Sequence, residues 1–274
     1  MSNRAPRIII SGGGTGGHIF PAIAIARELQ HIRPDAELLF VGAEGRMEME
    51  KVPQAGYRII GLPIAGIQRR LTWKNLLVPL KIIKSLLKAR SVIKEFKPDI
   101  AVGVGGYASG PLLRAASFMG VQTLVQEQNS YPGITNKILA RGAARICVAY
   151  EGMERFFPEE KIILTGNPIR PEIAQSTISR EDGCRHFGLD PGRKVLLVIG
   201  GSLGARTINL AIAAGAEKLG KEVQLIWQTG KSFASQAAGY EAPGICVREF
   251  IREMDMAYAA ADIIVSRAGA MSIS

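Results

Sequence analysis

The stretch RIIISGGGTGGH, residues 7–18, predicts a buried strand that runs through a glycine loop into a helix. Arg7–Ser11 is an apolar run of strand length, and Pro21–His31 has a helical pattern. Glycines let the backbone approach a ligand closely, and the N–H groups at a helix N-terminus favour an anion. The loop therefore predicts a phosphate-binding turn. A turn without a ligand also fits, as does a dinucleotide loop, although Glu44 lies beyond the usual spacing of about 20 residues.

The same alternation of strands and helices continues along the chain and predicts parallel sheets covered on both faces. A helical pattern also covers Leu76–Phe96, and polar residues 171–192 predict a connection. We therefore expect an α/β protein with two Rossmann-like domains, residues 1–165 and 166–274, facing a cleft. Further strands are predicted at Glu37–Val41, Asp99–Val104, Thr123–Gln126, Arg145–Ala149, Lys194–Ile199, Val223–Gln228, Ile245–Glu249 and Asp262–Ser266.

The second half holds only about four predicted strands where a doubly wound unit has about six. The sequence stops at Ser274, in the first turn of a predicted helix. A helix of one turn has nothing to propagate. We therefore expect the C-terminal domain to be truncated.

The composition and net charge of the chain limit the classes of partner that it is expected to bind. The 274 residues are 47% hydrophobic and 21% charged, which is typical of a globular protein, and the net charge is +10. An anionic membrane surface or a phosphorylated substrate fits this charge. Nucleic acid is not expected, because aromatics are only 6% and no basic run is interleaved with them. The cysteines are widely spaced, which favours a reducing, cytoplasmic location and no metal site.

Two more glycine loops follow predicted strands: GVGGYASGP at residues 103–111 and GGSLGAR at residues 200–206. Loops at the carboxyl ends of parallel strands would place anion sites on both walls of one cleft, which suits two phosphorylated substrates. His18 lies at the first helical turn beside such a site, where the positive helix end favours the neutral imidazole that a base requires. No D-x-D pair is present to hold a metal, so the charge of a leaving diphosphate would be met by helix N-termini and Arg170.

A basic, apolar stretch at residues 67–90 allows two interpretations. It is either a core helix with a solvated basic face or an interfacial patch, in which apolar residues enter the headgroups while cations meet anionic lipid. The residues that would associate with the membrane are Trp73, Leu76, Leu77, Lys81, Lys84 and Lys88.

In this order, the motifs resemble the undecaprenyl-diphospho-muramoylpentapeptide β-N-acetylglucosaminyltransferase family, the MurG family. The resemblance rests on Gly13–His18 with Pro21, Gly105–Tyr107 with Ser109–Pro111, Glu127–Asn129 with Gly133 and Thr135–Lys137, Gly166–Arg170, Gly200–Arg206 with Asn209, Phe250–Ile251, and Arg267–Ala270.

The resemblance implies a GT-B glycosyltransferase fold with the acceptor on the N-terminal domain and the nucleotide sugar mainly on the C-terminal one. It implies inverting transfer of N-acetylglucosamine from UDP-GlcNAc to the muramoyl 4-hydroxyl of lipid I, giving the lipid II of peptidoglycan synthesis, without a cofactor. The implied location is peripheral, on the inner face of the plasma membrane.

By position, the resemblance assigns catalytic roles to His18 and Glu127. It implies acceptor diphosphate contacts at Gly13, Gly14, Gly105, Gly106 and Tyr107. It implies UDP-GlcNAc contacts at Thr15, Gly16, Gly17, Asn129, Arg170, Ser202, Ile251, Ala270, Met271 and Ser272.

Two departures qualify the resemblance. Gln126 stands where the family often carries histidine, and the family's glutamate and glutamines for the nucleotide sugar would follow Ser274. Three alternatives therefore stay open: a UDP-sugar epimerase of the same fold class, a nicotinamide enzyme, and an inactive fragment that binds precursor or partner proteins.

Overall fold

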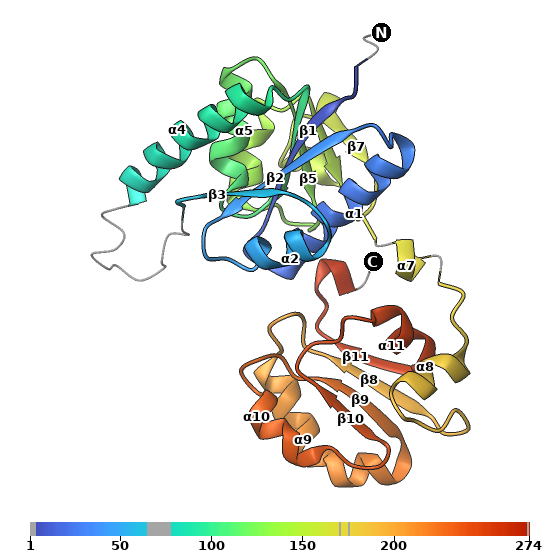
Figure 1. The fold of residues 1–274 in the computed structure, drawn as a ribbon. Coiled ribbons are helices and arrows are strands. Elements are labelled where there is room, and N and C mark those ends of the chain that lie inside the picture. The colour runs from blue at the N-terminus through green and yellow to red at the C-terminus, as the bar shows by residue number, and fades with distance from the viewer. Residues whose placement is uncertain (1–3, 65–77, 170, 175, 273) are drawn as a thin grey trace. The chain divides into compact units, whose positions relative to one another are not determined.

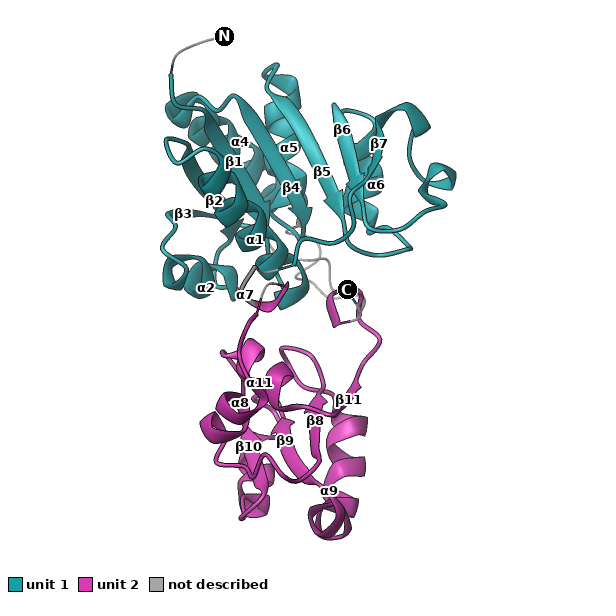
Figure 2. Cartoon of the chain, turned by 90° about the vertical axis from the view of Figure 1, so that its right-hand side faces the viewer, with its two compact units in different colours: residues 1–169, 274 teal, residues 170–273 magenta. Residues whose placement is uncertain are grey.

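The computed structural model describes residues 4–64, 78–169, 171–174, 176–272 and 274. The chain divides into two compact units, residues 1–169 with 274 and residues 170–273, shown in Figures 1 and 2. Each unit is an α/β domain built on a parallel sheet, as the sequence predicted. The sequence placed the boundary a few residues earlier, after residue 165.

Unit 1 contains a 7-stranded sheet in the order β3-β2-β1-β4-β5-β6-β7. The predicted strands are confirmed, while β3 and β7 were missed because four and three residues are too short to show a period. The strands are β1 (Arg7–Gly12), β2 (Glu37–Ala43), β3 (Ile59–Leu62), β4 (Ile100–Gly105), β5 (Gln122–Glu127), β6 (Arg145–Val148) and β7 (Ile162–Leu164).

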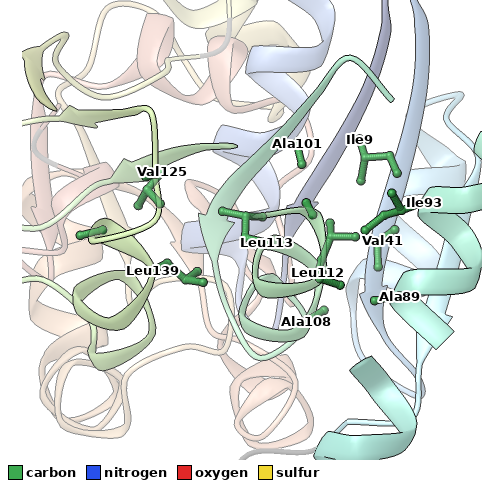
Figure 3. Close-up of a cluster of buried hydrophobic side chains, with 14 of the residues drawn as sticks. Ile9, Val41, Ala89, Ile93, Ala101, Ala108, Leu112, Leu113, Val125 and Leu139 are labelled. Carbon is green, nitrogen blue, oxygen red and sulfur yellow. The ribbon is translucent and has the colours of Figure 1, made fainter. Parts of the chain in front are cut away.

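Alternate residues of β1 enter two different cores. Ile9 packs in a cluster with α4 and α5 side chains, which Figure 3 shows, and Ile8 and Ile10 pack with α1 on the opposite face. Burying each isoleucine contributes about 1.5–3 kcal/mol, so both helical layers are held by the same strand. The helices of unit 1 are α1 (Gly16–Ile32), α2 (Glu48–Gln54), α4 (Val78–Phe96), α5 (Ser109–Phe118) and α6 (Ile134–Ala140).

Helix α1 begins at Gly16, five residues before the predicted start at Pro21. Proline is common in the first helical turn, which made Pro21 the expected start. In the structure Pro21 lies inside the helix and is buried. As a result, the N-terminus of α1 lies within the glycine loop that was predicted to bind phosphate.

Unit 2 contains a 4-stranded parallel sheet in the order β10-β9-β8-β11. Leu196 and Val198 of β8 pack toward α9, whereas Leu197 packs with α8 and α11 residues on the other face. The elements are α7 (Pro171–Ala174), α8 (Arg180–His186), β8 (Val195–Ile199), α9 (Arg206–Glu222), β9 (Gln224–Gln228), α10 (Ala234–Ala237), β10 (Ile245–Arg248), α11 (Met254–Ala260) and β11 (Ile263–Ser266).

The predicted connection at residues 171–192 contains two helices, the single turn α7 at its start and α8 in its second part, and α8 is the larger departure from the prediction. The helix is short, its Ser179 N-cap accepts a hydrogen bond from the Asp182 N–H, and Gly183 lies directly against α11. A Cβ on Gly183 would lie 2.7 Å from the Met256 carbonyl oxygen. Close packing, rather than a hydrophobic period, makes this segment a helix.

Candidate functional site

The first glycine loop uses some of its N–H groups internally and leaves others free. Gly13 donates to the carbonyl of Gly105 at 3.3 Å, and Gly14 donates to Oε2 of Glu48 at 2.8 Å. Gly16 and Gly17 are the first two residues of α1, where N–H groups have no intrahelical acceptor. Thr15 makes no side-chain cap, and the first turn of α1 has no acidic residue. The free donors and the helix dipole together favour an anion here.

The second loop packs directly onto the first. Gly105 and Gly106 have φ values of 106° and 90°, which side-chain-bearing residues rarely adopt. A Cβ on Gly106 would lie 2.4 Å from the Gly13 carbonyl oxygen, and one on Gly105 would lie 2.7 Å from Nδ1 of His18. Both glycines are therefore required for the two loops to meet.

Ser109 connects the first two glycine loops through its side-chain hydroxyl. Its hydroxyl is fully buried and donates toward the carbonyl oxygens of Ser11 at 2.9 Å and Gly105 at 2.8 Å. The ends of β1 and β4 are thereby held in register at the start of α5. The sequence showed Ser109 only as part of a motif, because a serine that joins two strands has no local signal.

Tyr107 is half exposed at the edge of this composite loop. Its ring lies next to Gly14, at 3.8 Å from the position of a Cβ there, and the Arg46 guanidinium carbon is 5.9 Å from the ring centroid. Arg46 is exposed and was missed by the sequence analysis, since nothing in its neighbourhood marks it as a ligand. It adds a cation beside the two glycine loops.

His18 is half-buried, and its Nδ1 lies 2.9 Å from Oε1 of Gln128. Gln128 is 1% exposed and follows β5 directly. Its amide nitrogen donates to the carbonyl of Val104 at 2.8 Å. His18, the candidate base, is therefore held by Gln128. The sequence analysis included Gln128 in a motif but gave it no role.

The carboxylate of Glu127 is buried and fully engaged. Its Oε1 accepts hydrogen bonds from the backbone and side-chain amides of Asn129 at 3.0 and 2.9 Å. Its Oε2 accepts from the Gly133 N–H at 3.1 Å and from Nδ2 of Asn136 at 2.8 Å. Four donors occupy the lone pairs of this carboxylate, so it shapes the loop that leads into α6.

In unit 2 the third glycine loop joins β8 to α9, which starts at Arg206 without a side-chain cap or an acidic first turn. Gln228, 3% exposed at the end of β9, connects this loop to the next. Its Nε2 donates to the Gly201 carbonyl at 3.0 Å, and its Oε1 accepts from the Ile251 N–H at 2.8 Å. Gln228 thereby brings the segments of Ser202 and Ile251 together, and the sequence analysis had missed it.

Asn209, one of the motif residues, is buried and structural. Its Nδ2 donates to the Thr229 carbonyl at 2.7 Å, and its Oδ1 accepts from the Trp227 indole at 3.0 Å. Ala270, Met271 and Ser272 form a 3₁₀ turn after β11. Because β11 and β8 are parallel neighbours, this turn lies at the sheet edge from which the third loop emerges. Arg170 lies outside the described residues.

The structure describes only some of the residues that were predicted to associate with the membrane. Trp73, Leu76 and Leu77 lie outside the described residues, whereas Lys81 and Lys84 are exposed on α4. Lys88 forms an ion pair with Glu44 at 2.8 Å. Over the described ranges, no helix is both long and apolar enough to cross a bilayer.

The outer face of α4 is apolar as well as basic. Leu80, Ile83 and Leu87 are 56%, 54% and 64% exposed. They lie at helical spacing and form a stripe on the side away from Ala89 and Ile93, which pack in the core. Helix α4 therefore carries two apolar faces, of which only one is covered within unit 1.

Residues 8–148 match the glycosyltransferase family 28 N-terminal domain, and residues 195–274 match the glycosyltransferase family 28 C-terminal domain. The chain is 59% identical to the UDP-N-acetylglucosamine–N-acetylmuramyl-(pentapeptide) pyrophosphoryl-undecaprenol N-acetylglucosamine transferase of Bacteroides fragilis, over 98% of this chain and 73% of that protein. It is 56% identical to the protein of the same name from Porphyromonas gingivalis, over 100% of this chain and 74% of that protein.

Solved structures agree with these relatives. The crystal structure of Acinetobacter baumannii MurG matches with a TM-score of 0.68 and 29% identity, over 98% of this chain and 75% of that one. A UDP-GlcNAc 2-epimerase from Neisseria meningitidis matches with a TM-score of 0.68, over 96% of this chain and 78% of that one. At 13% identity the epimerase shares the fold alone.

Proposed function

The chain belongs to glycosyltransferase family 28, and from this premise we propose that it transfers N-acetylglucosamine from UDP-N-acetylglucosamine to N-acetylmuramyl-(pentapeptide) pyrophosphoryl-undecaprenol. The relatives at 56–59% identity carry this activity in their names, which favours it over the epimerase alternative. The geometric observation that carries the proposal is His18 in the first turn of α1, beside N–H groups that the helix leaves free.

In the proposed reaction the muramoyl 4-hydroxyl oxygen attacks the anomeric carbon of the sugar from the face opposite UDP. A C–O bond forms to the acceptor, and the bond between the anomeric carbon and the UDP oxygen breaks with its electron pair leaving on UDP. His18 takes the hydroxyl proton on its free ring nitrogen. The anomeric centre is inverted, and no cofactor takes part.

Anion binding in unit 1 is assigned to the donors that the fold leaves available. These are the N–H groups of Gly16 and Gly17 with the Thr15 hydroxyl, which the resemblance assigns to UDP-GlcNAc and which we propose here for the acceptor diphosphate, supported by the Arg46 cation. The N–H groups of Gly13 and Gly14 act within the fold, so these glycines shape the site together with Gly105 and Gly106. Arg46→Ala should raise KM for the lipid acceptor about tenfold in steady-state assays, with an unchanged KM showing that Arg46 takes no part.

Glu127 is assigned a positioning role instead of proton transfer. Its four donors hold Asn129 and the loop before α6, and a carboxylate so engaged has no lone pair free for the acceptor hydroxyl. Asn129 is exposed at the tip of this loop and remains a proposed donor contact.

The UDP diphosphate is assigned to the third loop of unit 2. The N-terminus of α9 is uncapped, and Ser202 and Ile251 lie on segments that Gln228 connects. Ala270, Met271 and Ser272 follow at the same edge, and Arg170 is proposed to meet the charge that develops on the leaving group.

The test follows labelled sugar from UDP-N-acetylglucosamine into a lipid acceptor carrying the pyrophosphoryl-muramoylpentapeptide. His18→Ala should lower turnover by roughly 10²–10⁴-fold with little change in donor KM, while His31→Ala, whose side chain is 83% exposed, should not. A normal rate in His18→Ala would remove His18 from the role of base. Absence of transfer by the wild-type chain, with the Bacteroides fragilis relative active in the same assay, would contradict the function.

We further propose that the outer face of α4 rests on an anionic membrane surface. The stripe of Leu80, Ile83 and Leu87 offers apolar area for the headgroup region, and the exposed cations Lys81 and Lys84 flank it. This location would keep a peripheral enzyme beside a membrane-bound acceptor.

Vesicle sedimentation distinguishes this surface from general basicity. Lys81→Glu with Lys84→Glu should weaken binding to vesicles that contain anionic phospholipid by at least about 30-fold, since each cation near the surface is worth about 1 kcal/mol and two are lost. Lys218→Glu with Lys221→Glu on α9 changes the net charge equally and should leave binding nearly intact. Equal losses in both double variants would contradict a role for α4.

A further inference from the structure

The orientation of the Gln128 side-chain amide is fixed by its surroundings. Three oxygens surround Nε2: the Val104 carbonyl at 2.8 Å, the Gln126 carbonyl at 3.4 Å, and the Gln126 side-chain oxygen. Oxygens of this kind only accept hydrogen bonds, so the amide nitrogen must face them. A flipped amide would set an oxygen against two backbone carbonyl oxygens in a site where Gln128 is 1% exposed.

The fixed amide directs Oε1 of Gln128 at Nδ1 of His18, 2.9 Å away. Because this oxygen is only an acceptor, Nδ1 must carry a proton. In the neutral imidazole the lone pair then lies on Nε2, which has no hydrogen-bond partner within the described part of the chain. We propose that Gln128 is a positioning residue that locks His18 in its Nδ1–H tautomer.

The sheet holds the parts of this lock rigidly. Val104 is the last residue but one of β4 and Gln126 lies in β5, and these strands are parallel neighbours. The amide of Gln128 is thus bound to two adjacent strands. Gly105 makes room for the same Nδ1 edge, because a Cβ there would lie 2.7 Å from Nδ1 and from Cε1. The Nδ1 edge of the ring is therefore set by the Gln128 acceptor and by close packing at Gly105.

An amide suits this position better than a carboxylate. A carboxylate beside Nδ1 would favour the charged imidazolium, which cannot accept a proton. The neutral Gln128 oxygen orients the ring without placing a charge beside it. This assignment rests on the proposed function, since Nε2 is the atom that takes the acceptor proton there.

The tautomer can be measured without any turnover. The chain contains only three histidines, so long-range ¹H–¹⁵N correlation of the imidazole rings gives three spin systems, with His31 and His186 as internal references. In the wild-type chain at a pH where the rings are neutral, His18 should show the Nδ1–H pattern. An Nε2–H pattern for His18 would overturn the proposal even if transfer activity is found.

A variant of Gln128 tests whether this residue determines the tautomer of His18. Gln128→Met keeps the length of the side chain but removes the acceptor, and should let His18 convert to a mixture of tautomers. Gln224→Met, which places methionine at a buried glutamine of unit 2, controls for the loss of a buried amide and should leave all His18 signals unchanged. An unchanged His18 spectrum in Gln128→Met would refute the lock.

Kinetics separate positioning from simple destabilisation. Gln128→Met should lower kcat by about 10-fold to 100-fold while KM for UDP-N-acetylglucosamine changes little, as for other partners that orient a histidine. In a His18→Ala background the same substitution should cause no further loss, because Gln128 acts through His18. An equal loss in both backgrounds would show a structural effect only. Absence of transfer by the wild-type chain would count against the proposed function and leave the spectroscopic result as the test of the tautomer.

Discussion

The carboxylate of Glu48 holds the first glycine loop in place by accepting a hydrogen bond from the Gly14 N–H at 2.8 Å. Its second oxygen accepts from the Ala43 N–H at 3.0 Å, and the side chain is 1% exposed. Room for it comes from two glycines, because a Cβ on Gly13 or Gly42 would overlap it. One buried acid thus joins the ends of β1 and β2 and sets the entry into α1.

Glu48→Ala should therefore destabilise unit 1 and disorder the site together. Two buried N–H groups would lose their acceptor, and we expect a loss of about 2–4 kcal/mol in the free energy of unfolding. Urea unfolding and the acceptor KM measure the two effects. Glu50→Ala, at an exposed position of the same helix, is the matched control. Equal stability in the two variants would show that the Glu48 bonds contribute little.

Gly106→Ala tests whether the first two loops must touch. The substitution adds a Cβ that would lie 2.4 Å from the Gly13 carbonyl oxygen at a φ of 90°. Gly120→Ala meets the same kind of strain, at a φ of 76°, but has nothing within 4 Å of its Cβ. We expect Gly120→Ala to cost about 1 kcal/mol with unchanged kinetics, and Gly106→Ala to lower kcat/KM at least tenfold. Similar kinetics in both would argue against the loop contact.

Gln228→Leu tests the connection between the third loop and Ile251. The variant removes the bonds to Gly201 and Ile251, so the donor KM should rise about tenfold or more. Gln224→Leu, at the opposite end of β9, removes two bonds to Asp190 and should destabilise unit 2 similarly without raising the donor KM. Isothermal titration with UDP measures the donor affinity of both variants, which should fall more in Gln228→Leu than in Gln224→Leu. A larger effect from Gln224→Leu would contradict the assignment of the donor site.

Asp262 should make unit 2 sensitive to acid. The Lys194 ammonium, the Val195 N–H and the Arg180 guanidinium hold its carboxyl and lower its pKa from 3.8 to about 2. A lowered pKa stabilises the folded state above the unfolded value, and this contribution is lost as pH falls from about 4 toward 2. Hydrogen exchange at the Val195 amide should accelerate in Asp262→Asn at neutral pH. The difference from wild type should shrink toward pH 2, and a constant difference would contradict the linkage.

Much of the fold could be read from local patterns. The Ile8–Ile10 centre of the strand Arg7–Gly12 and the strand Val195–Ile199 are apolar runs that are typical of a doubly covered parallel sheet. The short strands Ile59–Leu62 and Ile162–Leu164 could not be predicted, because they exist only as edge partners of longer strands. Helix α8 was missed for a related reason: its stability comes from packing Gly183 against α11, which leaves no period in the sequence.

The sequence by itself determined the family, the two α/β units and the three glycine loops, because strand period and glycine spacing are local properties of the chain. The tertiary structure alone decided what each loop residue does. His18 and Gln128 are 110 residues apart and meet because the sheet places β1, β4 and β5 side by side. Gly14 and Glu48 meet through the neighbouring strand β2, and Gln228 reaches Gly201 and Ile251 across adjacent strands. Such partners depend on strand order, which follows from packing the whole core and is not written in any short segment.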